Sequence, residues 1–257
     1  MREDRSLRYF EFIGRLGMTK HYGSIDATRE LAEACGITRD SYVLDVGCGV
    51  GATPALLAKE IGCRVVGVDV VESMLEQTRE RAKAAGVKSL VDARLGDARN
   101  LPFEDDTFDA VLTESVLIFF PEKLEALREF ARVCKPAGVV GISEMIWLVP
   151  DPPAKMVEMY KELIYAESLD AEGYVHLMKE AGYSHVVAYP HRMDVRAEGR
   201  GRIERYGCLG TLGILLRMLK LFVTDRDAWM FIKGGVGGVS DDMFDVMGYG
   251  LFTGRKP

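Results

Sequence analysis

The sequence has few of the residues that mark disulfide-bonded or metal-binding proteins. Its 257 residues include five cysteines, an odd number with no C-x-x-C pair: Cys35, Cys48, Cys63, Cys134 and Cys208. This pattern favours reduced thiols over a disulfide framework or a zinc site, so no metal is expected. The first residues are charged and lack the apolar core of a secretion signal. We therefore expect a cytoplasmic protein.

Long apolar runs and an excess of basic charge are also missing. The longest apolar stretch, residues 212–223, is interrupted by Arg217 and Lys220 and is shorter than the ~20 residues of a membrane span. The 33 basic residues are outnumbered by 39 acidic ones, a net charge of −6, which disfavours nucleic acid as a partner. Side-chain amides are limited to Gln77 and Asn100, and their scarcity is typical of thermophile proteins. We expect a thermophilic source and no membrane span.

Between about residues 28 and 145, apolar runs of strand length alternate with segments of helical period. This alternation predicts an α/β fold made of βαβ units. Strands are expected at 42–46, 64–69, 91–95, 108–113 and 139–144, and helices at 28–35, 53–61, 72–85 and 124–134. The segment Lys135-Pro136-Ala137-Gly138 is expected to break the last of these helices before the fifth strand. Beyond it we expect helices at 154–166 and 171–181, and strands at 185–195 and 248–253.

A glycine-rich turn, Gly47-Cys48-Gly49-Val50-Gly51, joins the first strand to the next helix. Glycine lets the backbone approach a ligand closely, and a helix N-terminus offers N–H donors, so a nucleotide-like ligand is favoured. Asp69 ends the second strand 18 positions after Gly51, where a carboxylate can accept hydrogen bonds from ribose hydroxyls. Ala52 completes the looser fingerprint G-x-G-x-x-[GA], so the turn alone leaves NAD enzymes open.

The ordered series of motifs is more specific than the turn. Over residues 42–144 the sequence resembles the class I S-adenosylmethionine-dependent methyltransferases, of the small-molecule, methyltransferase type 11-like kind. The motifs that carry the resemblance are Val43 to Gly51, Val68-Asp69, Gly96-Asp97-Ala98, Leu101-Pro102-Phe103 and Phe108-Asp109. Lys135 to Gly138 resembles the family's K-P-G-G turn, with Ala137 as a departure. The resemblance implies a Rossmann-like, mostly parallel sheet with an antiparallel last strand and helices on both faces.

The resemblance also implies a binding role for particular residues. The turn residues Gly47, Cys48, Gly49 and Gly51 would hold the methionine part of S-adenosylmethionine. Asp69 would meet the ribose hydroxyls, and Asp97 the adenine amino group with the Ala98 amide at the ring. Val70 and Gly96 would be further cofactor contacts. Asp45 would order the turn or meet the amino group of the cofactor, beside Glu114. Met74 would pack on the ribose or the adenine, although a plain core methionine fits the sequence nearly as well.

Candidate catalytic residues are fewer. Glu114 ends the fourth expected strand and Glu144 the fifth, and ligands of open α/β sheets bind beyond the carboxyl ends of strands. Either glutamate would orient an acceptor amine or act as a general base; capping a helix or pairing with a surface cation is the alternative for both. His21 and Tyr22 lie in the N-terminal segment, where the family often places a lid, so a proton-accepting or carboxylate-binding role is open to them.

We divide the chain as one methyltransferase domain, 1–257. It comprises an N-terminal cap segment at 1–27, a cofactor-binding core at 28–195, a helical insertion at 196–247 and a final strand at 248–257. In the insertion Leu212, Leu215, Leu216, Leu219 and Phe222 share one helical face. Such faces usually bury against protein, so we expect core or a homodimer contact. The alternative is a pocket wall for an apolar acceptor such as a quinone or a lipid head.

The expected activity is transfer of a methyl group from S-adenosylmethionine to a small-molecule acceptor by in-line displacement. The protein would chiefly supply alignment, desolvation and proton removal. A methyltransferase acting on a lipid or quinone is one alternative. Others are an NAD(P)-dependent oxidoreductase, a non-catalytic cofactor-binding protein and an aminopropyltransferase using the decarboxylated cofactor.

Overall fold

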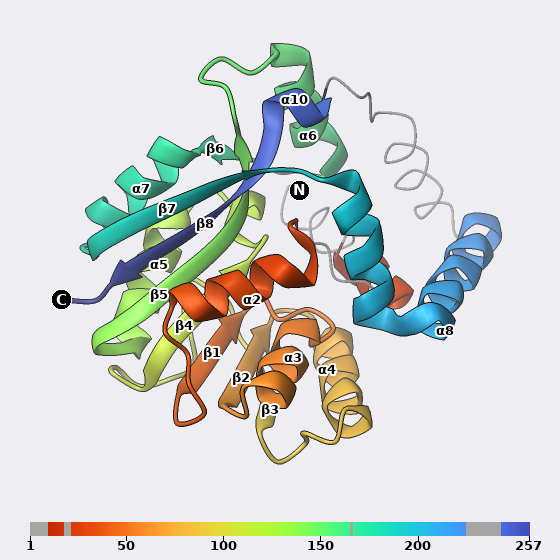
Figure 1. Cartoon of the computed structure of the whole chain (residues 1–257), viewed down its shortest axis with the longest axis horizontal. Coiled ribbons are helices and arrows are strands. Elements are labelled where there is room, and N and C mark those ends of the chain that lie inside the picture. The colour runs from red at the N-terminus through yellow and green to blue at the C-terminus, as the bar shows by residue number, and fades with distance from the viewer. Residues whose placement is uncertain (1–9, 18–21, 165–166, 225–242) are drawn as a thin grey trace.

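A computed structural model describes residues 10–17, 22–164, 167–224 and 243–257 (Figure 1). Its centre is one sheet with the strand order β3-β2-β1-β4-β5-β8-β7, and β6 pairs with β5 outside this path. The strands are β1 (Tyr42–Val46), β2 (Arg64–Asp69), β3 (Val91–Leu95), β4 (Phe108–Glu114), β5 (Cys134–Trp147), β6 (Leu169–Asp170), β7 (Ser184–Arg192) and β8 (Met247–Arg255).

The pairing pattern confirms the expected fold class. The strands from β3 to β5 pair in parallel, as does β6 with β5. The last strand, β8, runs antiparallel to both of its neighbours, β5 and β7. The carboxyl ends of β1, β2, β4 and β5 therefore meet at the same edge of the sheet, where ligands of open α/β sheets bind.

Helices cover both faces of the sheet (Figure 1). Those described with full bounds are α2 (Ser24–Ala34), α3 (Ala52–Glu60), α4 (Glu72–Ala84), α5 (Lys123–Val133), α6 (Ala154–Ile164), α7 (Ala171–Glu180), α8 (Val195–Thr224), α10 (Met243–Val246) and the 3-10 turn η1 (Leu117–Phe119). On one face α2 and α3 pack against Val43 and Val65. On the other, α5 and α7 pack against Leu44 and Val66. Neighbouring strand residues thus point to opposite cores, because side chains alternate along a strand.

The structure differs from the expected elements at several places. The Lys135–Gly138 segment is not a turn ahead of the fifth strand: it lies inside β5, where the pairing with β4 is irregular and Ala137 has a φ of 61°. The helix expected from Thr28 begins at Ser24. The strand β6 is only two residues long and carries no sequence signal.

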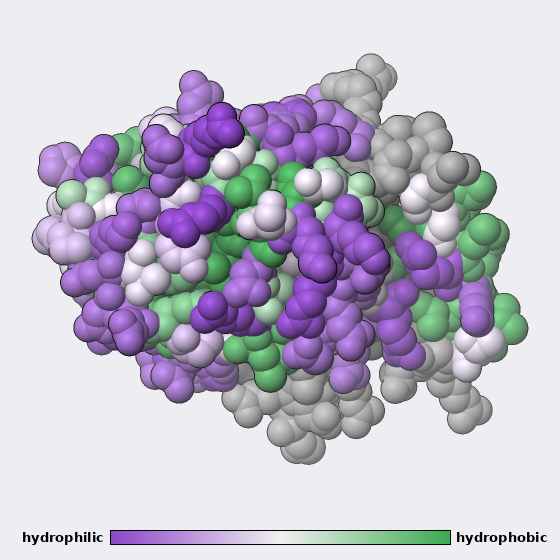
Figure 2. Space-filling model, turned by 90° about the horizontal axis from the view of Figure 1, so that it is seen from below, coloured by the Kyte–Doolittle hydropathy of each residue, from purple (hydrophilic) through white to green (hydrophobic). Residues whose placement is uncertain are grey.

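The leucine face of α8 is exposed on this chain, which corrects the expectation that it belongs to the core. A homodimer contact through this face stays a prediction. Among the described residues of this helix, Leu212, Leu215, Leu216 and Leu219 are exposed. Figure 2 shows hydrophobic side chains at the right-hand edge of the surface, the side on which α8 lies in Figure 1. The reason is that α8 packs by its opposite face. Ile214 is buried, and Met218 and Leu221 pack against the core that contains Phe12, Ile13 and Leu16 of the N-terminal helical residues 10–16.

Polar contacts hold α8 in this orientation. The Arg217 Nε donates to the Leu16 carbonyl at 2.9 Å. Arg29 of α2 pairs with Glu204 of α8 and with Glu60 of α3, both at 2.8 Å. None of the helices in the described ranges, α8 included, has the length and apolar character needed to cross a membrane.

The orientation of α8 predicts opposite results for two substitutions on the same helix. Ile214→Ala removes a buried side chain, so we expect a loss of about 2–4 kcal/mol in the free energy of unfolding. Leu219→Gln changes a side chain that is 57% exposed, so we expect a change within about 0.5 kcal/mol. Urea unfolding of both variants measures the two values. A large loss for Leu219→Gln would show that the leucine face is covered.

Candidate functional site

Three carboxylates lie at the edge of the sheet where β1, β2 and β4 end. Asp45, Asp69 and Glu114 are 2%, 8% and 9% exposed. Burial raises the pKa of Asp45 well above its ordinary value, and the nearby charges of Glu114 and Asp69 raise it further. Burial also raises the pKa of Asp69. The site therefore gathers three carboxyl groups in a region from which water is largely excluded, where burial disfavours their charged forms.

The glycine turn closes over this edge. Gly47, Gly49 and Gly51 have φ values of 75°, 53° and 75°, the left-handed region that glycine adopts without strain. The amides of Gly47 and Cys48 donate to the Val68 carbonyl at 2.7 and 2.9 Å, which ties the turn to β2. A Cβ added at Gly47 would collide with the Val116 side chain. The backbone of the turn thus lies directly against the segment that follows β4.

Asp69 is held in place by backbone donors. The Gly49 amide donates to Oδ2 at 2.9 Å, and the Val71 amide donates to Oδ1 at 3.0 Å. A carboxylate has about four lone-pair sites, so each oxygen retains capacity for another donor. The following residue, Val70, is 47% exposed and offers an apolar surface next to the carboxylate.

Asp97 follows β3 and has a different environment. Its carboxylate accepts three hydrogen bonds from Arg99, one from the backbone amide and two from the guanidinium, at 2.7–3.0 Å. These bonds to Arg99 hold its pKa below the ordinary value, so Asp97 stays ionised. The neighbouring Ala98 is buried. Gly96 lies against Pro102, since an added Cβ there would be 2.8 Å from its Cδ.

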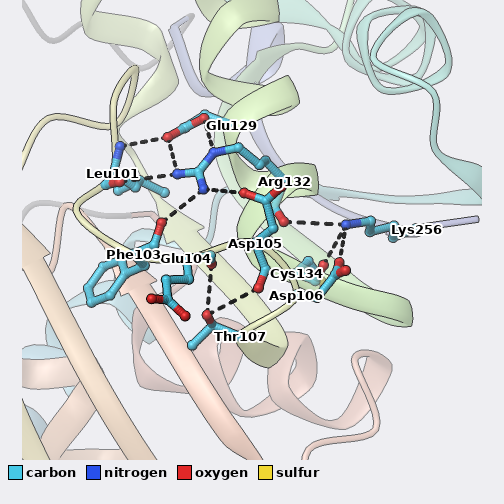
Figure 3. A network of polar contacts seen from close by, with 10 residues as sticks. All are labelled: Leu101, Phe103, Glu104, Asp105, Asp106, Thr107, Glu129, Arg132, Cys134 and Lys256. Atoms are coloured by element: carbon cyan, nitrogen blue, oxygen red, sulfur yellow. Dashed lines mark hydrogen bonds and ion pairs between the residues drawn. The ribbon is translucent and has the colours of Figure 1, made fainter.

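The loop between Asp97 and β4 is fastened to α5 by Arg132 (Figure 3). This guanidinium donates to the carbonyls of Leu101 and Phe103 and pairs with Glu129 and with Asp105. Glu129 also accepts from the Leu101 amide at 2.8 Å. Lys256, near the C-terminus, pairs with Asp106 at 2.6 Å. The network fixes the loop that carries Asp97 and Ala98.

Glu114 is engaged by two hydroxyl groups. Thr28 of α2 donates to Oε2 at 2.9 Å, and Thr53 of α3 donates to Oε1 at 2.6 Å. The carboxylate therefore links β4 to both helices that cover this face. Sequence reasoning missed the two threonines, because the only signal, a threonine near the start of a helix, occurs widely as a cap.

Glu144 organises the segment after β4. Its Oε1 accepts from the amides of Val116 and Leu117, both at 2.7 Å. Burial raises its pKa to about 8, against the opposing effect of those amides and of Lys123. Its Oε2 is buried without a hydrogen-bond partner among the described residues. Because Val116 lies against Gly47, Glu144 connects β5 to the glycine turn.

Other expected site residues lie in apolar surroundings. Met74 is buried against Val50 of the glycine turn, Phe12 of the N-terminal helical residues and Ile118 of η1. The Cys48 thiol lies 3.9 Å from the Thr78 hydroxyl of α4, and burial raises its pKa well above the ordinary value, so this thiol is unreactive. Tyr22 packs against a cluster formed by Met145, Trp147 and Met247. His21 lies outside the described residues.

Comparison with known proteins gives consistent matches. The family model described as a methyltransferase domain matches residues 44–142. Methyltransferase GfsG of Streptomyces halstedii is 31% identical over 236 residues, which cover 90% of this chain and 79% of that protein. Phosphoethanolamine N-methyltransferase 1 of Zea mays is 30% identical over 166 residues, 65% of this chain and 32% of that longer protein.

Two solved structures show the same fold. The crystal structure of the [4+2]-cyclase SpnF has a TM-score of 0.78 at 20% identity and covers 97% of this chain and 94% of that one. The phosphoethanolamine N-methyltransferase 2 of Haemonchus contortus in complex with S-adenosyl-L-methionine has a TM-score of 0.71 at 21% identity, covering 92% of this chain and 54% of that one. Likeness at this level of identity concerns the fold.

The environment of Glu144 predicts a pH-dependent stability. Its pKa of about 8 lies above the ordinary 4.5, so between these values the folded protein binds more protons than the unfolded chain. Stability therefore falls as the pH rises through this window and levels off above it, by a few kcal/mol from this group. Glu144→Gln keeps an acceptor for the Val116 and Leu117 amides and should remove this part of the fall. Urea unfolding at pH 5.5, 7.0 and 8.5 measures it.

The matched control is Glu76→Gln, which changes an exposed glutamate of α4. Buried Asp45 and Asp69 contribute in every variant to the change of the free energy of unfolding with pH. The difference in this change between Glu144→Gln and the unsubstituted chain therefore isolates Glu144. An unchanged slope in Glu144→Gln would contradict the assignment.

Proposed function

The chain belongs to the class I S-adenosylmethionine-dependent methyltransferases, and from that premise we propose that it methylates a small-molecule acceptor by in-line displacement. The names of its relatives support a small acceptor: they include phosphoethanolamine N-methyltransferases and a sarcosine/dimethylglycine N-methyltransferase of Halorhodospira halochloris. Family membership sets aside the NAD(P)-dependent oxidoreductase that the glycine turn alone left open.

The observation that carries the proposal is the set of three buried carboxyl groups at the ends of β1, β2 and β4. S-adenosylmethionine carries a sulfonium and an ammonium group, so a cationic ligand would relieve the mutual repulsion of Asp45, Asp69 and Glu114. Asp45 Oδ2 is buried and has no hydrogen-bond partner among the described residues, so it can accept from the ammonium group. A dinucleotide would instead place its anionic pyrophosphate near these carboxylates.

The residues present fit the other parts of the cofactor as well. We assign the ribose hydroxyls to Asp69, whose two oxygens keep free lone pairs, with Val70 as the apolar contact beside them. Asp97 would accept from the adenine amino group while it keeps its bonds to Arg99, and Ala98 would meet the ring. The methionine part would lie along the backbone of Gly47, Cys48, Gly49 and Gly51, where the absence of side chains allows close approach.

The bound cofactor supplies an already activated methyl group, so the protein chiefly aligns the acceptor and excludes water. The N-terminal helical residues and η1 cover the glycine turn with an apolar layer, in which Phe10 and Phe119 stack edge to face at 4.8 Å. On the acceptor side, Met145, Trp147 and Met247 are buried beyond the end of β4. These residues favour an acceptor with an apolar part, and a lipid or quinone remains the second candidate.

Removing the carboxylate of Asp69 should weaken binding of S-adenosylhomocysteine. Asp69→Ala loses charge-assisted hydrogen bonds to the ribose, so we expect an affinity about 10–100-fold lower by titration calorimetry. Asp92→Ala on β3, which removes a side chain that is 56% exposed, is the control and should leave the affinity within about twofold. Equal affinity in both variants would refute the ribose assignment.

Methyl-labelled S-adenosylmethionine tests the activity itself. The protein is incubated with fractionated cell extract, and the label is followed into aqueous small-molecule, lipid and macromolecular pools. We expect label in the aqueous pool with the unsubstituted protein. We expect none with Asp69→Ala when the cofactor concentration is below the raised dissociation constant of this variant. Label confined to the lipid pool would identify the acceptor as a lipid or quinone instead of a water-soluble small molecule. Label in macromolecules alone would refute the proposal.

A further inference from the structure

A cavity of about 610 Å³ lies between the start of α5, helix α6, strand β6 and helix α7. Its apolar lining includes Leu124, Trp147, Val157 and Leu177. The volume is within the range of sites for small molecules, which typically combine an apolar wall with a few polar groups. None of the residues assigned above to the cofactor lines it.

The charged residues that line the cavity are Glu122, Lys123, Lys161, Glu167 and His176. Most of them already have an opposite charge within 4 Å. Glu122 lies 3.7 Å from Arg99, and Lys161 lies 3.3 Å from Glu167. The His176 ring lies 3.9 Å from the Glu180 carboxylate. For Lys123, no ion pair within 4.0 Å is formed with any residue in the described ranges.

Lys123 is also the most buried of the five. It is 6% exposed, and its ammonium group donates to the Phe120 carbonyl at 2.9 Å. An ammonium has three N–H donors, so this bond leaves donor capacity. Burial lowers the pKa of Lys123, while the charges of Glu144, Glu167 and Glu122 at longer range raise it and that of Lys161 lowers it. Lysine is rarely buried without a partner, because an uncompensated charge in an apolar environment is costly.

We propose that this cavity binds a small amphipathic molecule whose carboxylate or phosphate is the counter-ion of Lys123. The apolar part of the ligand lies against Trp147 and Leu124. Lys123 is the first residue of α5, and the N-cap residue Glu122 makes no side-chain capping bond, so the positive end of the helix dipole adds to the attraction. Trp147 is shared with the apolar cluster on the acceptor side, and the inference holds whether or not the ligand is methylated.

The probes are octanoate and octyl phosphate, with octanol as the neutral probe of equal chain length. Titration calorimetry on the full chain should show that one or both anions bind at least about tenfold more tightly than octanol, as expected for a hydrogen bond to a charged group. The preferred anion identifies the ligand as a carboxylate or a phosphate. Lys123→Met should remove this preference while leaving the octanol affinity within about threefold.

The control Lys179→Met removes an exposed lysine from α7, a helix that lines the same cavity, and should keep the preference for anions. S-adenosylhomocysteine affinity reports whether each variant is folded and whether the cofactor site is intact. Equal affinities of the unsubstituted protein for octanol and both anions, or an unchanged preference in folded Lys123→Met, would overturn the proposal.

The position of the bound anion is measured in a separate experiment. The chain has two tryptophans, Trp147 and Trp229, so Trp229→Phe leaves only the one that lines the cavity. In this variant a bromine-substituted octanoate should quench the fluorescence of Trp147 with the same concentration dependence as binding. Binding without quenching would place the anion elsewhere and overturn the proposal.

Discussion

Three carboxylates are buried side by side where β1, β2 and β4 end, and the local structure is arranged around their charge. Buried charges require partners, and the chain provides them unequally. Asp69 receives the amides of Gly49 and Val71, and Glu114 receives the hydroxyls of Thr28 and Thr53. These bonds also fasten the glycine turn, α2 and α3 to the sheet. Asp45 keeps one oxygen unpartnered, which leaves the edge suited to a cation.

The sequence predicted the sheet and this edge because both depend on local patterns. Parallel strands buried on both faces appear as continuous apolar runs, and β1 and β2 match the expected ranges residue for residue. The edge strand β3 also matches its range, although it is largely exposed. The glycine turn is equally local, since left-handed backbone at Gly47, Gly49 and Gly51 requires glycine. The ligand contacts assigned to these residues remain predictions, whereas the cofactor follows from membership of the family.

The features that sequence reasoning missed depend on contacts between distant residues. A leucine stripe predicts which residues of α8 share a face, but not which face packs inward. Here the choice is made by the burial of Ile214 and by the packing of Met218 against the core that contains Leu16, with Arg217 bonded to the Leu16 carbonyl. Glu144 also binds the amides of Val116 and Leu117 through Oε1, a structural role that was not expected, and its role towards a ligand stays a prediction. Its position in the sequence does not reveal these partners 27 and 28 residues away.

Proteins with this fold differ in the reactions for which they are named, which explains why the cofactor is easier to identify than the substrate. A structure with this fold is named a [4+2]-cyclase and another a phosphoethanolamine N-methyltransferase, so the fold does not specify the reaction. Methyl transfer from a sulfonium needs little beyond alignment and desolvation, so no fixed set of catalytic side chains marks the acceptor.

Discrimination between acceptors must then come from segments appended to the sheet. In this chain we propose the N-terminal helical residues and α6 for this role. Helix α6 adjoins Met145, Trp147 and Met247, which lie where β5 ends and β8 begins, and all present apolar side chains. Under the proposed function, the acceptor is therefore selected mainly by the shape of an apolar surface, which a sequence motif does not describe.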